Sequence, residues 1–303
     1  MKLRTDSVTV RVPASTSNCG SGFDTLGLAL GLYNTVTLSR STGAAPNPER
    51  PDDARAAQMV SEAVGALARI SSLAPFGFNY RIEGEVPPAR GLGSSVTVIA
   101  GVLAGLAALQ GTKIERKKLV SLVTAIEGHP DNASAGILGG FCVSRSDPAS
   151  GDYIDSMRFE VPDNVAFVVA SPPVELMTKE SRGALPGSLP FFDAVKSVNA
   201  ASYLVAAFAS RDYAQLRHVS SDFIHEPYRL ARIPGAKDAI AAGVAEGAWT
   251  GWLSGSGSSV LCVCERSKAE SVSAAMGESF GRVSMAAECR TLAADNQGLV
   301  VQA

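Results

Sequence analysis

The sequence predicts a globular protein of mixed strands and helices, arranged in two halves. Apolar residues make up 46% of its 303 positions and charged residues only 18%, which supplies a packed core and excludes a disordered chain. Windows with strand and helix periodicity alternate along the chain, without internal repeats. A polar stretch rich in Asp, Ser, Pro and Gly, residues 144–162, marks the expected boundary between two domains of ordinary size.

The predicted elements follow from local hydrophobic spacing and turn residues. In the first half they are, in order, strands at Val8–Val12 and Tyr33–Leu38, a loop at Thr42–Asp53, a helix at Ala54–Ile70, a strand at Phe76–Ile82, and helices at Ser95–Gln110 and Glu115–Glu127. In the second half they are a strand at Val165–Ala170, helices at Asp193–Ser210, Tyr213–Ile224 and Ala236–Ala245, and strands at Ser259–Glu265 and near Arg282–Glu288.

Charge and apolar runs exclude several classes of partner. Lys and Arg total 27 and Asp and Glu total 29, so no general surface for nucleic acid is expected. The longest apolar run, Val96–Leu109, is shorter than the roughly 20 residues of a membrane span and predicts a buried helix. The first residues carry no export signal. Five scattered cysteines indicate reduced thiols of a cytoplasmic protein, with no second pair near Cys262 and Cys264 to complete a zinc site.

Arg90–Ser95 is the first stretch that indicates chemistry, because its two glycines stand directly before an apolar helix. Such a turn directs successive N–H groups at an anion, and the helix N-terminus adds partial positive charge. Taken alone, the turn is more often a structural start of a helix. It lacks the Lys of a Walker loop and the third glycine of a dinucleotide fingerprint, so Mg²⁺ would have to supply the charge that bound phosphates need.

Three more clusters combine glycine with polar side chains. They are Pro13–Asp24, Glu127–Asn132 and Gly251–Ser259. The first and third are also compatible with ordinary turns, because Asx and Ser side chains stabilise such turns by bonding their own backbone. The second places four polar groups at the end of a predicted helix, followed by small and apolar residues, which indicates the wall of a site.

Taken in their order along the chain, the four stretches resemble the signatures of the homoserine kinase family. That family belongs to the superfamily that includes galactokinase, homoserine kinase, mevalonate kinase and phosphomevalonate kinase. Glu175–Arg182 and His225–Arg229 are also similar to segments of that family, and the likeness covers about residues 8–290. It implies an α+β fold with an ATP-binding N-terminal domain, residues 1–155, similar to ribosomal protein S5 domain 2. A ferredoxin-like C-terminal domain, residues 156–303, would follow, with the active site in the cleft between the two.

The resemblance implies which residues hold the nucleotide. Ser95 and Glu127 would ligate Mg²⁺, which accepts oxygen ligands and keeps several waters. The expected ATP-binding residues are Arg90, Gly91, Leu92, Gly93, Ser94, Ser95, Ser256 and Gly257.

The implied phosphoryl acceptor, L-homoserine, is a zwitterion with a terminal hydroxyl. Its site needs a cation for the carboxylate, hydrogen-bond acceptors for the ammonium group and a geometry that points the hydroxyl at the γ-phosphate. By the same likeness Arg182 and Arg229 would clamp the carboxylate. The full expected substrate set is Asn18, Asp24, His129, Asp131, Asn132, Thr178, Arg182 and Arg229. The expected catalytic set is Asp24, Ser95, Glu127 and Arg182, with Asp24 placed first in substrate binding and second as a general base.

The implied activity is ATP-dependent phosphorylation of the homoserine hydroxyl, giving O-phospho-L-homoserine in threonine biosynthesis. The family also contains homodimers. The sequence departs from the family pattern at Cys19 and Ser21, at Val96 and Thr97, and at Ser258 and Ser259, none of which replaces an expected ligand. Two alternatives stay open: a sister kinase for another small hydroxylated amino acid such as threonine, and a ligand sensor without catalysis.

Overall fold

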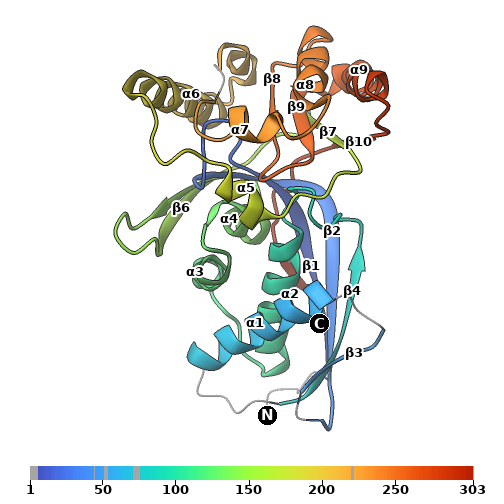
Figure 1. The fold of residues 1–303 in the computed structure, drawn as a ribbon. Coiled ribbons are helices and arrows are strands. Elements are labelled where there is room, and N and C mark those ends of the chain that lie inside the picture. Colours follow the sequence, from blue (N-terminus) through green and yellow to red (C-terminus); the bar gives the residue numbers. More distant parts are fainter. Residues whose placement is uncertain (1–5, 44, 51–53, 71–75, 220–221, 303) are drawn as a thin grey trace.

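A computed structural model describes the chain except for residues 1–5, 44, 51–53, 71–75, 220–221 and 303, and except for the side chains at 69–70 and 178–179 (Figure 1). This part contains a sheet of seven strands and a sheet of four. The first sheet carries helices on one face, and the second sheet stands at its end, uppermost in Figure 1. Two mainly antiparallel sheets with separate groups of helices confirm the predicted α+β class.

The first sheet has the strand order β11-β1-β2-β4-β3, with β5 on the first part of β2 and β6 on β5. Its strands are β1 (Ser7–Ser17), β2 (Leu26–Arg40), β3 (Pro46–Pro48), β4 (Phe78–Gly84), β5 (Phe141–Ser146), β6 (Tyr153–Phe159) and β11 (Val300–Gln302). The helices on its covered face are α1 (Ala54–Ile70), α2 (Ser94–Leu109), α3 (Arg116–Glu127) and α4 (Asp131–Leu138). Strand β2 pairs with β5 at Leu26–Leu28 and with β4 at Asn34–Arg40. The register between β1 and β2 shifts between these two parts, at Pro13 and Ala14 of β1.

The second sheet is antiparallel, with the order β10-β7-β9-β8. Its strands are β7 (Val165–Ser171), β8 (Thr250–Leu253), β9 (Val260–Glu265) and β10 (Glu288–Leu292). The helices of this half are α5 (Thr178–Gly183), α6 (Phe191–Ser210), α7 (Glu226–Leu230), α8 (Ala236–Ala245) and α9 (Ala269–Arg282), with short 3-10 turns at Tyr213–His218 and Arg266–Lys268.

Side chains of β7 and β9 alternate between two cores, as the period of two in a strand requires. Val168 and Cys262 pack beneath α8 and α9, whereas Phe167 and Leu261 face the first sheet. That second face forms one apolar cluster with the ends of β1, β2 and β5 and with α6. At its centre Phe141 of β5 stacks on Phe208 of α6, with ring centroids 4.1 Å apart. The two halves therefore share a core that joins them rigidly beside the site.

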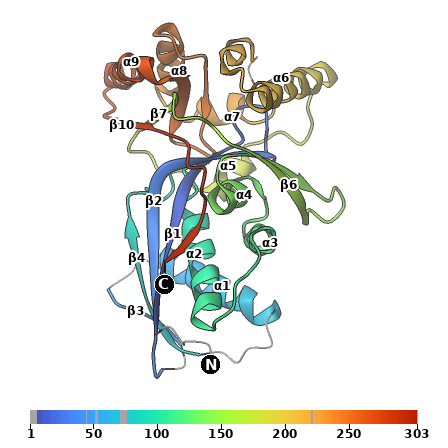
Figure 2. The same cartoon turned by 180° about the vertical axis from the view of Figure 1, so that it is seen from behind.

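The predicted boundary region, residues 144–162, is occupied mostly by the β5–β6 hairpin. Its Asp147 and Gly151 form the hairpin turn, so these turn-favouring residues mark a bend within the first sheet. The division expected at residues 155 and 156 falls inside β6. The chain also returns at its end, because β11 pairs with β1 (Figure 2).

Two predicted elements are wrong, and a third region differs in detail. Tyr213–Ile224 is not one helix: a 3-10 turn ends at His218, and Asp222 then accepts hydrogen bonds from the N–H groups that begin α7. No strand covers 282–287, because α9 continues to Arg282 and β10 begins at Glu288. The loop expected at 42–53 holds the short strand β3. The other predicted strands and helices are present, with ends shifted by up to several residues.

Two further sequence expectations bear on partners and redox state. Among the described residues, no helix is both long enough and apolar enough to cross a membrane. All five cysteines are free thiols, and four of them are buried.

Candidate active site

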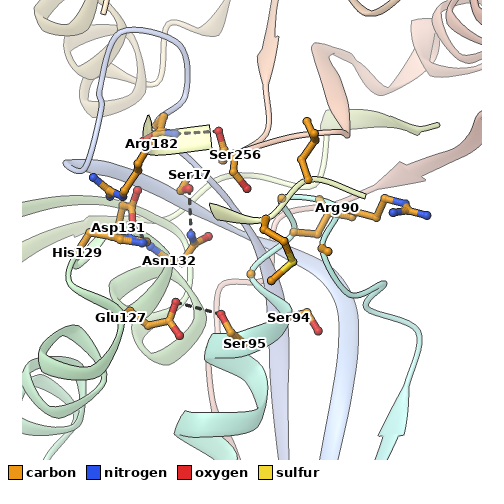
Figure 3. A pocket seen from close by; sticks show the side chains of 18 of the residues that line it. Ser17, Arg90, Ser94, Ser95, Glu127, His129, Asp131, Asn132, Arg182 and Ser256 are labelled. Atoms are coloured by element: carbon orange, nitrogen blue, oxygen red, sulfur yellow. Dashed lines mark hydrogen bonds and ion pairs between the residues drawn. The ribbon is translucent and has the colours of Figure 1, made fainter. Parts of the chain in front are cut away.

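One pocket gathers all four sequence clusters at the junction of the two sheets (Figure 3). Strands β1 and β2 bring Asn18 and Asp24, the N-terminus of α2 brings the Gly91–Ser95 turn, and α3 and α4 bring Glu127 to Asn132. The second half contributes Arg182, Arg229 and the Gly255–Ser256 turn. Residues separated by more than 200 positions thus line a single cavity.

At one end of the pocket, the Gly91–Ser95 turn leads into α2. Gly91 and Gly93 have φ of 73° and 69°, and Gly93 is the residue that caps the helix. The first turn of this 16-residue helix contains no acidic residue. Its free N–H groups and positive dipole end therefore form a site for an anion.

The two glycines are also required by packing. A Cβ at Gly91 would lie 2.0 Å from the carbonyl oxygen of Ser254, and one at Gly93 would lie 2.2 Å from Ser15 Oγ. Ser15 N–H donates to the Leu92 carbonyl, and Ser254 Oγ donates to the Gly91 carbonyl. The turn is consequently held between the first and third glycine clusters, which fixes it before any ligand binds.

Beside this turn, Ser95 Oγ donates to Glu127 Oε2 at 3.0 Å. Burial is the main cause that raises the pKa of Glu127, while the charge of His129 and the Ser95 hydroxyl oppose the rise. Glu127 ends α3, where the helix dipole disfavours a negative charge. Within the described part of the chain it has no ion-pair partner, so a cation bound here would satisfy it. A hydroxyl and a carboxylate are oxygen ligands of the kind that Mg²⁺ prefers.

The other end of the pocket is lined by charged side chains. Asp24 and Arg182 form a two-point ion pair, with Nη1 to Oδ2 at 3.0 Å and Nη2 to Oδ1 at 2.5 Å. Asp24 has a φ of 54°, and its N–H donates to Asn18 Oδ1. Asn18 in turn donates through Nδ2 to the Gly255 carbonyl. These hydrogen bonds hold Asp24 next to the Gly255–Ser256 turn of the second half.

His129 and Asp131 form a buried pair next to Asp24. Nδ1 of His129 lies 2.5 Å from Asp131 Oδ1. Burial lowers the pKa of His129, but the charge and hydrogen bond of Asp131 more than offset this and raise it to about 9. The pKa of Asp131 is lowered, because the His129 charge and the Asn132 N–H outweigh burial. At neutral pH the pair is therefore imidazolium and carboxylate.

Arg229 is the buried cation of this end, with 2% of its surface exposed. Its Nε donates to the Ser181 carbonyl and its Nη1 to the Gly255 carbonyl, and no acid pairs with it among the described residues. Burial, followed by the charge of Arg182, lowers its pKa to about 10. A buried guanidinium bonded only to neutral groups is a strong anion site, because a bound carboxylate supplies the missing counter-charge.

Some predicted residues are placed differently from the expectation. Arg90 extends away from Ser95 toward Glu175, whose carboxylate lies 4.0 Å from its Nη1 (Figure 3). Leu92 is buried and offers the pocket only its backbone. Gly257 does not line the pocket, since its missing side chain faces Ile233 and Leu253.

Asn132 and Thr178 are two other predicted substrate residues. Asn132 uses its amide to hold β1, accepting from Ser15 Oγ at 2.8 Å and donating to Ser17 Oγ at 3.0 Å. It still lines the pocket, but its hydrogen bonds give it a supporting position. Thr178 begins α5, and its side chain lies outside the described part of the structure.

The sequence reasoning missed Phe23, whose ring contacts both Arg182 and Arg229. Its centroid is 5.2 Å from the guanidinium carbons of both Arg182 and Arg229. An aromatic face attracts cations at this distance. The signal was available, since Phe23 stands alone between Gly22 and Asp24 inside the first glycine cluster. A single aromatic residue does not by itself indicate a binding site, because most aromatic side chains belong to the core.

Comparison with known proteins agrees with this geometry. The GHMP kinases match through their N-terminal domain at residues 55–140 and through their C-terminal domain at residues 204–282. Homoserine kinase of Moorella thermoacetica is 36% identical over 303 residues, covering 96% of this chain and 99% of that protein. The chain belongs to the homoserine kinase family of the GHMP kinases. The family's enzyme from Parasynechococcus marenigrum is 35% identical over 96% of this chain and 94% of its own.

Solved structures support the same assignment. The crystal structure of homoserine kinase from Cytophaga hutchinsonii superposes with a TM-score of 0.88 at 27% identity, covering 100% of this chain and 99% of that one. Mevalonate kinase from Methanococcus jannaschii has a TM-score of 0.68 at 12% identity, covering 96% and 99%. The second likeness concerns the fold alone.

Proposed function

We propose that this protein transfers the γ-phosphate of ATP to the side-chain hydroxyl of L-homoserine, giving O-phospho-L-homoserine for threonine biosynthesis. The observation that carries the proposal is one cavity with a phosphate-binding helix N-terminus at one end and a buried, unpaired Arg229 at the other. A nucleotide and a small zwitterion can therefore meet in the same pocket. Phosphoryl transfer depends mainly on such positioning and on neutralising charge.

At the nucleotide end, the N–H groups of Gly91–Ser95 would bind the phosphates. Ser95 and Glu127 would hold Mg²⁺, which when bound neutralises charge on the β- and γ-phosphates. The raised pKa and the lack of a described ion pair at Glu127 support this assignment. Gly91 and Gly93 have no side chains, so their backbone can approach the phosphates closely.

At the acceptor end, Arg229 and Arg182 would bind the carboxylate, and Asp24 and Asp131 the ammonium group. The carboxylate of Asp24 forms two hydrogen bonds with Arg182, and the carboxylate of Asp131 forms one with His129. Both carboxylates thus already hold cationic side chains in place, and phosphoryl transfer depends little on a strong base. We therefore place Asp24 in substrate binding rather than in general-base catalysis, and we expect Asp24→Asn to raise the KM for homoserine while most of kcat is kept.

An acceptor panel tests the proposed function. Purified protein with ATP and Mg²⁺ is offered homoserine, threonine, mevalonate or galactose, and ADP release is followed by a coupled assay. We expect kcat/KM to be highest for homoserine, with a phosphate monoester on the γ-oxygen seen by ³¹P NMR. A higher kcat/KM for threonine would replace the proposal by the sister kinase. Binding of ATP and homoserine without ADP release would replace it by the sensor.

A further inference from the structure

We propose that His225 is a positioning residue for the acceptor: it holds Arg229 and the Gly20–Asp24 turn in one fixed relation. The proposal rests on the proposed function, because it assigns Arg229 to the acceptor carboxylate. His225 does not line the pocket and is 0% exposed, so it acts on the substrate through its neighbours. It is the residue directly before α7, and Arg229 lies one helical turn later.

Three contacts tie His225 to the acceptor end. Nε2 lies 2.8 Å from the Gly20 carbonyl oxygen, in the turn that carries Asp24. Nδ1 lies 3.5 Å from Nη1 of Arg229. The imidazole also packs on Phe23, with ring centroids 5.4 Å apart, and Phe23 is the ring that faces both pocket arginines. His225 thus connects the first glycine cluster to the buried cation of the second half.

The partners determine the tautomer. A carbonyl only accepts, so Nε2 must carry the proton toward Gly20; a guanidinium only donates, so Nδ1 must offer its lone pair to Arg229. Burial lowers the pKa of His225, the Arg229 charge lowers it further, and Asp222, the Gly20 carbonyl and Asp24 oppose this. The ring is therefore neutral, and its two nitrogens have different tasks.

Asp222 fixes the place of this ring. Its carboxylate accepts from the N–H groups of Ile224, His225 and Glu226, which anchors the start of α7. Its Oδ2 is 3.7 Å from Nε2, farther than the Gly20 carbonyl. Because the backbone of His225 is held independently of its ring, removing the ring need not unfold α7.

Two amide variants separate the tasks, because the side chain of Asn places its polar atoms near Nδ1 and that of Gln near Nε2. His225→Asn keeps an acceptor for Arg229 and loses the bond to Gly20. His225→Gln keeps the donor for Gly20 and loses the acceptor for Arg229. Since a hydrogen bond to a charged group is worth more than a neutral one, we expect the Gln variant to raise the KM for homoserine by about tenfold or more and the Asn variant by less.

The readouts distinguish positioning from general damage. The KM for ATP and the kcat should stay within about twofold of wild type in both variants, since neither nitrogen contacts the nucleotide end. In an Arg229→Met background, His225→Gln should add almost nothing, because coupled residues are not additive. An unchanged KM for homoserine in both variants, or equal rises in the KM for ATP and for homoserine, would overturn the positioning role. A wild-type protein that phosphorylates no acceptor would instead overturn the proposed function.

Discussion

The two ends of the pocket are built by different means. The nucleotide end consists mainly of backbone, with Gly91 and Gly93 in left-handed conformations and the open N-terminus of α2. The acceptor end consists of charged side chains, paired as Asp24 with Arg182 and His129 with Asp131, with Arg229 left over. Backbone dipoles suit a ligand whose phosphates carry diffuse charge, whereas a small zwitterion needs separate charges at fixed places.

The difference also concerns distance along the chain. The residues of the nucleotide end lie within one continuous half, between Gly91 and Glu127. The acceptor end joins Asp24 to Arg182 and Arg229 across the junction of the two sheets. Changes at the first end should therefore affect ATP and the transfer step, and changes at the second should affect the acceptor.

The largest effect is expected from Glu127→Gln. Loss of the carboxylate that we assign to Mg²⁺ removes charge stabilisation in the transition state, and we expect kcat to fall by about 10²–10³-fold. Turnover measured against Mg²⁺ concentration checks this, with Glu270→Gln on the exposed face of α9 as a surface control. A kcat within threefold of wild type would show that Glu127 is not a metal ligand.

Arg229→Met tests the buried cation at the acceptor end. Losing a charge-assisted contact to a carboxylate is worth about 2–3 kcal/mol, so the KM for homoserine should rise by roughly 30- to 150-fold. The KM for ATP should not change. Arg232→Met, on an exposed arginine three residues later, is the matched control. Equal effects of both variants would refute a specific carboxylate contact.

Gly93→Ala tests the backbone-built end. Ala would be strained at a φ of 69°, and its Cβ would lie 2.2 Å from Ser15 Oγ. We expect the turn to shift and the KM for ATP to rise by about tenfold, since positive φ alone costs about 1–2 kcal/mol in a non-glycine residue. Gly281→Ala in α9, where a Cβ meets nothing within 4 Å, is the control. A raised KM for homoserine with normal ATP binding would contradict the separation of the two ends.

The smallest effect is a pH dependence from His129. Its pKa is raised to about 9, above the ordinary 6.5, so the pair with Asp131 stabilises the fold fully below about pH 6.5 and loses that contribution as pH rises through about 9. The contribution is about 3 kcal/mol or less. Urea unfolding of wild type and His129→Gln at pH 6 to 10 should show a difference in unfolding free energy that shrinks from about pH 6.5 to about pH 9 and is nearly gone above it. A difference that stays constant would exclude an ionised pair.

Much of the fold was predictable, because α1 has apolar residues at helical spacing and α2 is a long apolar run that begins directly after Gly93. The predictions failed where tertiary contacts decide. Asp222 anchors the start of α7 through its own carboxylate, four residues after the 3-10 turn ends at His218, and hydrophobic periodicity gives no sign of such a bond. The turn residues of the β5–β6 hairpin are the same types that mark linkers, so their pairing alone distinguishes the two.

The same division holds for the site. The sequence by itself determined the chemical groups and the glycine turns, because local steric and hydrogen-bonding rules act over a few residues. Only the tertiary structure decided which groups meet. The ion pair of Asp24 with Arg182, the isolation of Arg229 and the bridge through His225 all depend on the packing of two sheets around Phe141 and Phe208. Burial is the main cause that lowers the pKa of Arg229 and of His225, and burial is a property of the whole fold.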